Sequence, residues 1–381
     1  MPLTDTDLSD LTLWRRQLHA MPEVSGAEHE TAAEVVRFLE KTEPDVIVTG
    51  LGGTGVAAVF SGHEPGPTVL FRCELDALPI AEISDLPYRS RIAGKGHMCG
   101  HDGHMATLAA LALAFQRKRP ARGRVVLLFQ PAEENGAGAA AVLADAKFKP
   151  LTPDFSFALH NMPGIALGTS WIKDGPANCA SAGLTIRLTG KTAHASMPET
   201  GISPAPAIAA LIPAFAALAK GTLEDGDLTL ATVTHVAIGE AAFGIAPGDG
   251  EIWVTLRTVS DDQMAALKDK AERMARGAAE AHGLAVSFSY HDQFGHCRND
   301  PQAANIIRRA IAAEDLPFEE GKAFRASEDF GRFGTVSKSA MFFLGAGEKH
   351  PALHNPDYDF PDALIGIGSR IFLRIASDVL G

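Results

Sequence analysis

The sequence predicts an α/β fold, with a central mixed sheet flanked by helices and an α+β region inserted into it. Two continuous apolar runs, at 68–72 and 124–129, have the pattern of strands buried on both faces of a sheet, and helical segments follow them. Near Pro176 the pattern changes to alternating apolar and polar residues, which is typical of half-exposed antiparallel strands. After Asp300 the first pattern returns, so we expect one unit to interrupt the other.

The first unit is expected at residues 1–178 and 292–381, where helices alternate with strands. Its expected elements are helices at 10–19 and 28–41, strands at 46–49, 55–60 and 68–72, a helix that contains the apolar run at 105–115, a strand at 124–129, a helix ending near 147, a strand at 155–160, a helix at 302–314, a strand at 339–344 and a helix at 362–379.

The inserted unit is expected at residues 179–291, as a small α+β sandwich. Its expected elements are strands at 182–189, 228–235, 250–257 and 284–290, and helices at 205–220 and 261–282.

Length and charge restrict the class of protein. The chain has 381 residues, of which 46% are hydrophobic, so two domains can each bury a core. The net charge of -12 argues against the basic surface that nucleic-acid binding requires, and we expect no nucleic-acid partner. The longest apolar tract, at 204–219, is too short and too rich in proline to span a bilayer, so no membrane association is expected.

The cysteines indicate a reducing compartment. Cys73, Cys99, Cys179 and Cys297 are scattered, unlike a disulfide framework. Cys99 belongs to a cluster of metal-ligand residue types, which also favours reduced thiols. The acidic first ten residues lack the apolar core of a signal peptide, so we expect a cytoplasmic protein.

The segment 94–107 gathers residue types that bind metals or move protons. Five of them fall within eight positions: His97, Cys99, His101, Asp102 and His104. The glycines between them allow the backbone to turn tightly, and imidazole and thiolate are good ligands for a zinc-like ion. The apolar run that follows predicts a helix with Asp102 near its N-terminus, so the cluster is expected on a loop that enters a helix.

Acidic residues follow the buried strands. Glu74 and Asp76 come directly after one of them, Glu133 and Glu134 follow the next, and His160 stands at the exit of a third. In an open α/β sheet, sites gather at the carboxyl ends of strands. Of two adjacent glutamates, one can bind a metal and the other can move a proton. The alternative is that they form the acidic first turn of a helix.

Eight segments, spread over nearly the whole chain, together carry a resemblance to a known family. They are Leu-His-Ala-Met-Pro-Glu at 18–23, Glu-Leu-Asp-Ala-Leu-Pro at 74–79, His-Met-Cys-Gly-His-Asp-Gly-His at 97–104, Gln-Pro-Ala-Glu-Glu at 130–134, Leu-His at 159–160, Gly-Lys-Thr-Ala-His-Ala at 190–195, Ser-Glu-Asp-Phe at 327–330 and Leu-His at 353–354. In these segments the chain resembles the M20 metallopeptidase and aminoacylase family. The closer match is the family's amidohydrolase branch, with its hippurate hydrolases, N-acetyl-amino-acid deacetylases and auxin-conjugate hydrolases.

The resemblance implies a zinc-peptidase-like catalytic domain with two divalent metal ions per subunit, zinc or manganese, with cobalt as a further candidate. The positions that match the branch's metal ligands are Cys99, His101, Glu134, His160 and His354. Glu133 matches the general base and acid, and Asp76 matches an aspartate that supports the site. The implied reaction is hydrolysis of the amide bond of an N-acyl amino acid, with a metal-bridging water as the nucleophile.

The inserted unit resembles the family's lid and dimerisation domain, which implies a homodimer or a larger homo-oligomer. His194 matches a histidine that reaches the substrate's carbonyl group and would stabilise the oxyanion. Arg257 lies at a strand end, where family members use an arginine for the substrate's carboxylate. The alternatives are an exposed loop histidine and an exposed strand-end arginine.

Three departures from the branch's pattern fall where substrate and lid meet, at Met197–Glu199, Gly244–Pro247 and Ala326. They leave the substrate class open. One alternative is a dipeptidase or carboxypeptidase of the same family. The other is a catalytically silent ligand-binding homologue, against which the complete ligand set and Glu133 argue.

Overall fold

Four parallel strands form the middle of an eight-stranded mixed sheet in the computed structural model, which describes residues 3–381. These strands are β4 (Arg122–Gln130), β3 (Glu64–Glu74), β5 (Phe155–Pro163) and β16 (Lys338–Gly347). Met1 and Pro2, where the predicted first unit and the acidic terminal stretch begin, lie outside the described residues. The mixed sheet flanked by helices confirms the predicted fold class.

The sheet continues on both sides with shorter strands. Antiparallel β2 (Gly55–Ser61) and β1 (Val46–Leu51) extend it beyond β4. Beyond β16 come β6 (Ser170–Ile172) and β15 (Phe318–Glu320), neither of which the sequence predicts, because runs of three residues are too short to show a period.

The chain divides into two units. The first comprises the residues up to Ala177 together with 297–322 and 329–381, and the second comprises 178–296 together with 323–328. The predicted insertion at 179–291 lies inside the second unit.

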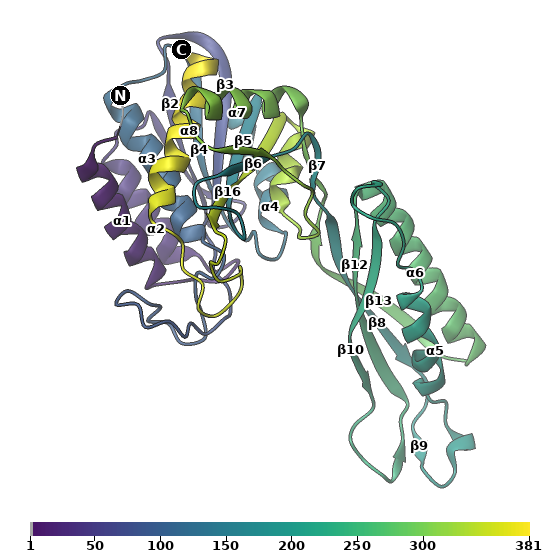
Figure 1. Ribbon diagram of the computed structural model, residues 1–381. Helices are drawn as coiled ribbons and strands as arrows, with labels where there is room; N and C mark the ends of the chain where they lie inside the picture. Colours follow the sequence, from purple (N-terminus) through teal and green to yellow (C-terminus); the bar gives the residue numbers. More distant parts are fainter. Residues whose placement is uncertain (1–2) are drawn as a thin grey trace. The chain divides into compact units, whose positions relative to one another are not determined.

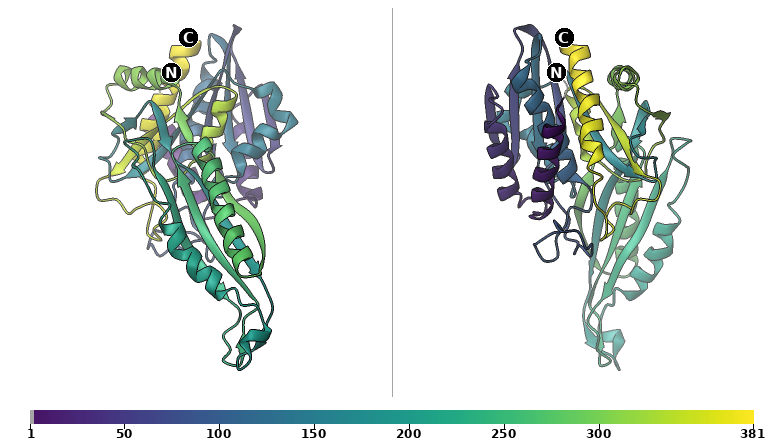
Figure 2. Two further views of the ribbon diagram at one scale, coloured as in Figure 1. Left: turned by 90° about the vertical axis from the view of Figure 1, so that its right-hand side faces the viewer. Right: turned by 60° about the vertical axis from the view of Figure 1, so that its left-hand side comes forward.

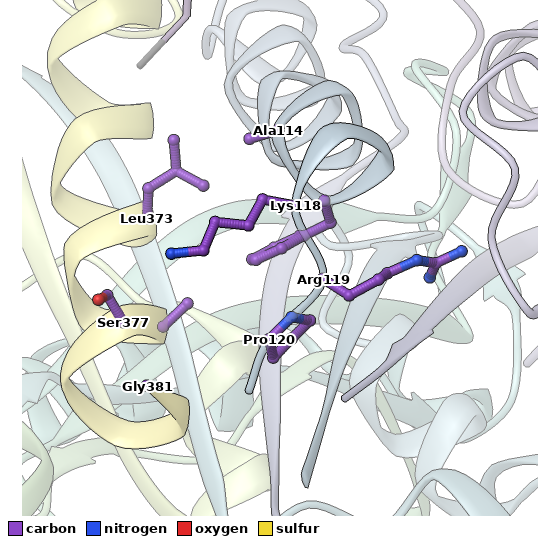
Figure 3. Close-up of a pocket in the computed structure, with 9 residues that line it drawn as sticks. Ala114, Lys118, Arg119, Pro120, Leu373, Ser377 and Gly381 are labelled. Atoms are coloured by element: carbon purple, nitrogen blue, oxygen red, sulfur yellow. The ribbon is translucent and has the colours of Figure 1, made fainter. Parts of the chain in front are cut away.

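In the first unit, α3 (His101–Arg117) packs beside the last helix, α8 (Ala363–Leu380), and Figure 1 shows the two running next to each other. α3 is buried along nearly its whole length, which its run of Ala and Leu requires. A cavity of about 110 Å³ lies between the ends of these two helices (Figure 3), where Lys118 points toward α8 and Arg119 points away from it. This cavity is at the end of α3 remote from His101.

The remaining elements of the first unit follow the predicted order with some changed bounds. They are α1 (Asp5–His19), α2 (His29–Glu40), α4 (Gly138–Ala144), the 3-10 helix η1 (Ala146–Leu151), β7 (Gly175–Asn178), β14 (Cys297–Asn299), α7 (Pro301–Ala313) and the 3-10 helix η3 (Asp329–Thr335).

Two predicted bounds are wrong for local reasons. α1 begins at Asp5 rather than at residue 10, because Thr4 and Asp7 form a capping box in which each side chain accepts from the other's backbone N–H. The helix predicted to end near 147 ends at Ala144, and the chain continues in a 3-10 turn that contains Pro150.

The second unit is a four-stranded antiparallel sheet with two helices on one face, as Figure 2 shows. The strand order is β10 (Thr229–Ile238), β12 (Asp249–Thr258), β8 (Ala180–Thr189) and β13 (Ala285–Phe294). α5 (Ala205–Ala216) and α6 (Asp261–Ala281) cover its apolar face, and Ser260 caps α6 by accepting from the N–H of Gln263. The short elements are β9 (Ala193–His194), η2 (Pro198–Thr200) and β11 (Ile245–Ala246).

None of the helices described between residues 3 and 381 combines the length and the apolar character that crossing a membrane requires.

Candidate metal centre

The predicted metal ligands gather at one edge of the eight-stranded sheet. β3, β4, β5 and β16 are parallel, so their carboxyl ends meet at this edge, where α3 also begins. The elements there bring together all five predicted ligands, which are Cys99, His101, Glu134, His160 and His354.

The ligands form two groups that share one thiol. Cys99, His101 and His160 have ligand atoms within 4.8 Å of one another, and so do Cys99, Glu134 and His354. Cys99 Sγ lies 3.5 Å from His160 Nε2, while Glu134 lies 3.8 Å from His101 Nε2 and 3.5 Å from His354 Nε2. Two groups around one shared sulfur fit a pair of adjacent metal ions.

The buried histidines turn the same ring atom toward the centre. His101 Nδ1 donates to the carbonyl oxygen of Asp76 at 2.8 Å, and His160 Nδ1 donates to the carbonyl oxygen of Asn161 at 2.7 Å. Each bond leaves Nε2 as the ring atom that can offer a lone pair to a metal ion when it carries no proton. His101 Nε2 is buried and has no hydrogen-bond partner among residues 3–381. A buried imidazole lone pair beside a thiol and carboxylates fits a metal ion.

The buried carboxylates of the cluster favour a positive charge near them. Burial lowers the pKa of His101, but the side chain of Asp76 and the charges of Glu74 and Glu134 outweigh it and raise the pKa to about 10. The pKa of His160 falls to about 3, mainly through burial. Without a metal, therefore, a proton on His101 partly balances the carboxylates, and a divalent ion would meet the same demand more fully.

The thiol of Cys99 needs the same cation. Burial raises its pKa well above the usual value, and the carboxylates of Glu134 and Glu133 raise it further. A bound metal ion reverses this effect, because a coordinating thiol loses its proton. Metal binding here should therefore release a proton.

Asp76 fixes two of the ligands. Besides its carbonyl contact with His101, its Oδ2 accepts from the N–H of Glu134 at 2.9 Å and from Ser25 Oγ at 2.7 Å. The side chain is fully buried. Asp76 thus contacts two of the candidate ligands, His101 and Glu134.

Glu133 lies beside the ligands. A carboxylate oxygen of Glu133, a ring nitrogen of His101 and a carboxylate oxygen of Glu134 lie within 4.8 Å of one another. The turn that carries both glutamates begins with Ala132, whose φ of 50° is left-handed. Neither glutamate caps α4, whose N-cap is Ala137, so the alternative of an acidic helix start is wrong.

Both ring nitrogens of His104 have hydrogen-bond partners, whereas His101, within the described part of the chain, has one only at Nδ1. Its Nδ1 lies 2.6 Å from Glu74 Oε2, and its Nε2 faces Asn161 Oδ1. Gly100, with a φ of 92°, lets this asparagine approach closely, since a Cβ there would overlap Asn161. His104 therefore supports the neighbouring His160 strand through Asn161.

Sequence reasoning missed several buried charges next to the ligands. Arg15 and His19 on α1 both contact Asp102, and Arg72 on β3 contacts Glu74 and Asp329. Two signals were available: a charged residue inside the apolar strand at 68–72, and basic residues at i and i+4 on one face of the first helix.

His194 and Arg257 belong to the second unit. His194 is exposed on β9, where its Nδ1 accepts from the backbone N–H and faces the hydroxyl of Ser196, at 3.1 and 2.8 Å. Arg257, on β12, donates from Nη1 to the carbonyl oxygen of Arg325 at 2.8 Å and to Ser327 Oγ at 3.0 Å.

The chain is similar to several known proteins over most of its length. Residues 70–378 match the model of peptidase family M20/M25/M40. An N-acetyl-L-cysteine deacetylase of Bacillus subtilis is 31% identical over 96% of this chain and 87% of its own length. A hippurate hydrolase of Campylobacter jejuni is 29% identical, with 95% and 94% covered. A solved structure of a B. subtilis dinuclear metal-binding peptidase of the M20 family superimposes with a TM-score of 0.83 at 27% identity, covering 99% of each chain.

Proposed function

The chain belongs to peptidase family M20/M25/M40, and from this membership we propose that it is a metal-dependent hydrolase of the amide bond of N-acyl amino acids. The observation that carries the proposal is the pair of ligand groups around Cys99, with Glu133 beside them. Relatives over most of the chain's length are deacetylases and a hippurate hydrolase, which favours an acyl amino acid over a dipeptide.

The residues have distinct roles in this proposal. Cys99, His101, Glu134, His160 and His354 hold two divalent ions. When bound, these ions lower the pKa of a water molecule and polarise the amide carbonyl. Glu133 accepts the proton of the attacking water and delivers it to the leaving amine, and Asp76 keeps His101 and Glu134 in place.

Two residues of the second unit complete the proposal. His194 stabilises the oxyanion that develops on the substrate carbonyl. The Ser196 N–H supports this role, because it makes Nδ1 an acceptor and leaves Nε2 to donate when the ring is neutral. Arg257 binds the substrate's carboxylate; its two bonds to 325 and 327 use one nitrogen of a guanidinium that carries five N–H donors.

The metal, the compartment and the oligomer are also proposals. The thiolate of Cys99 favours zinc, and the carboxylates tolerate manganese or cobalt. The four cysteines are free thiols, which supports a reducing compartment such as the cytoplasm. A homodimer through the second unit rests on the family resemblance.

The experiment is a hydrolysis assay on N-acetyl and N-benzoyl amino acids and on dipeptides. Metal-stripped protein is resupplied with zinc, manganese or cobalt. We expect metal-dependent release of free amino acid from the N-acyl substrates. Cleavage of dipeptides alone would move the protein to the peptidase alternative, and no cleavage by the metal-loaded protein would support the silent homologue.

The Glu133→Gln variant tests the base. We expect turnover to fall about 10²- to 10⁴-fold, the usual contribution of a general acid–base, with both metal ions still bound. The exposed Glu40 provides the matched control, since Glu40→Gln removes one carboxylate on α2 and should leave turnover unchanged. Unchanged turnover in Glu133→Gln would contradict its assignment.

A further inference from the structure

His354 has the least support among the five candidate ligands. His101 and His160 are buried and belong to α3 and β5, whereas His354 lies on the segment 348–362 between β16 and α8, here called the His354 loop. Its side chain is 51% exposed, and its backbone φ of 66° is left-handed, which is unfavourable for a residue other than glycine. Other contacts must therefore hold this loop where the ligand is needed.

Some of these contacts are made with the turn at 98–103, which carries Cys99 and His101 and leads into α3, and one is made with β5. The N–H of His354 donates to the carbonyl oxygen of Met98 at 2.7 Å. Phe360 packs against Gly103, where any side chain would overlap its ring. Tyr358 accepts from the side-chain amide of Asn161, the neighbour of His160.

One side chain links the loop to this turn by charge. Arg15 of α1 is fully buried, and its Nε lies 2.6 Å from Asp102 Oδ2, on the residue after His101. Its Nη2 donates to Asp359 in the His354 loop, and its Nη1 lies 3.4 Å from Asp362 at the loop's end. The fork of the guanidinium suits it to span separate carboxylates, which a lysine ammonium spans less well.

The charges explain why this link is needed. Asp102 is completely buried and the side chain of Asp359 is 23% exposed, so the two carboxylates would repel across a poorly hydrated gap. Among the described residues, three other groups face Arg15: His19, which contacts Asp102 at 2.9 Å, the ring of Tyr88, whose hydroxyl donates to Asp359, and the ring of Phe360. Arg15 is the only one of these that contacts carboxylates of both the turn and the loop at under 3 Å.

We propose that Arg15 is a positioning residue for the metal centre: by bridging Asp102 and Asp359, it fixes the His354 loop against the turn that carries Cys99 and His101. The proposal rests on the two-metal centre proposed above. In this proposal, the group of Cys99, Glu134 and His354 depends on Arg15 for its position. The group of Cys99, His101 and His160 is held by α3 and β5 instead.

The test is a titration of the metal-stripped protein with Zn²⁺, which gives the affinity of each site, alongside thermal unfolding of the metal-free protein. In Arg15→Lys we expect the weaker site to lose about 10- to 100-fold in affinity, as is usual for outer partners of metal ligands, with the tighter site within about twofold of wild type. Asp359→Asn should give the same result, because it removes the negative charge through which the His354 loop contacts Arg15.

Arg16→Lys is the matched control. Arg16 is the adjacent residue and donates to Asp362, but its side chain is 38% exposed. Both sites should keep wild-type affinity in this variant. If Arg15→Lys does not fold, Asp359→Asn carries the test, because that change keeps the shape of a partly exposed side chain.

Two results would overturn the proposal: unchanged affinities at both sites with only a lower unfolding temperature, or a wild-type protein that binds a single ion. Failure of the proposed hydrolase function can be distinguished from failure of the role proposed for Arg15. A protein that binds two ions but cleaves no N-acyl amino acid would refute that function, while the affinities of the variants would still decide the role of Arg15.

Discussion

The sheet-and-helix part of the second unit, at 180–290, differs from the first unit in what it buries. Between residues 180 and 290, every buried polar side chain is a hydroxyl, and the core between the sheet and its two helices is apolar. The first unit buries a set of charged side chains as well: Arg15, Arg72, Glu74, Asp76, Asp102 and Asp329. Three of these, Arg15, Asp76 and Asp102, lie within two positions of a candidate ligand or contact a side chain that does, and Glu74 contacts His104 on the same helix as His101.

The difference indicates where the first unit has a lower stability in exchange for a fixed arrangement of its charged side chains. A buried ion pair contributes little compared with apolar side chains of the same volume, yet losing one partner is strongly destabilising. Such networks are therefore weak evidence of stability and better evidence of a site that must hold its groups in place. The second unit, which lacks them in 180–290, should respond to charge removal very differently.

The largest effect should come from removing Arg72. Its Nε donates to Gln130 at 2.9 Å, its Nη2 donates to Asp329 at 2.6 Å, and its Nη1 donates to Glu74. Arg72→Met leaves two buried carboxylates without their main cation, which should lower the free energy of unfolding by about 3–5 kcal/mol. Urea denaturation measures this change in the free energy of unfolding.

A double variant sharpens this prediction. Arg72→Met combined with Asp329→Asn removes one of the two uncompensated charges, so it should be more stable than Arg72→Met alone. If the double variant were less stable than the single one, the loss would come from packing around the arginine rather than from charge.

A medium effect should appear in the pH dependence of stability. Burial lowers the pKa of His19, but Asp102 and Glu82 outweigh it and raise the pKa from 6.5 to about 9. The folded state thus holds this proton more tightly than the unfolded chain. The stabilisation is complete below about pH 6.5 and is lost as the pH rises through 9, at a cost of up to about 3 kcal/mol.

The measurement is urea denaturation of the metal-loaded protein from pH 6 to pH 10. His19→Gln should be less stable at neutral pH and should lack most of the wild-type decline above pH 7. The exposed His282 at the end of α6 gives the control, because His282→Gln removes a histidine from the unit without buried charges in 180–290. An unchanged decline in His19→Gln would contradict the assignment.

The sequence predicted the candidate metal ligands more completely than the residues that hold them in place. Cys99, His101 and Glu134 lie in short motifs whose residue types and spacing indicate a metal centre. Arg15 and Asp359, by contrast, are 344 positions apart, and nothing local to either one predicts their contact. The left-handed backbone at His354 is likewise set by the loop's packing. Periodicity gave the long strands and helices, but not the capped start of α1 or the three-residue strands β6 and β15.

The smallest effect should come from a surface ion pair of the second unit. Arg187 on β8 stands directly opposite Glu251 on β12, with Nε 3.3 Å from a carboxylate oxygen, and its side chain is 69% exposed. Water screens such a pair, so Arg187→Ala should lower the free energy of unfolding by less than about 1 kcal/mol. A double-variant cycle with Glu251→Ala isolates the pair itself and should give a coupling energy of a few tenths of a kcal/mol, falling with added salt. A loss as large as that of Arg72→Met would show that the second unit also relies on charge, and the contrast between the two units would fail.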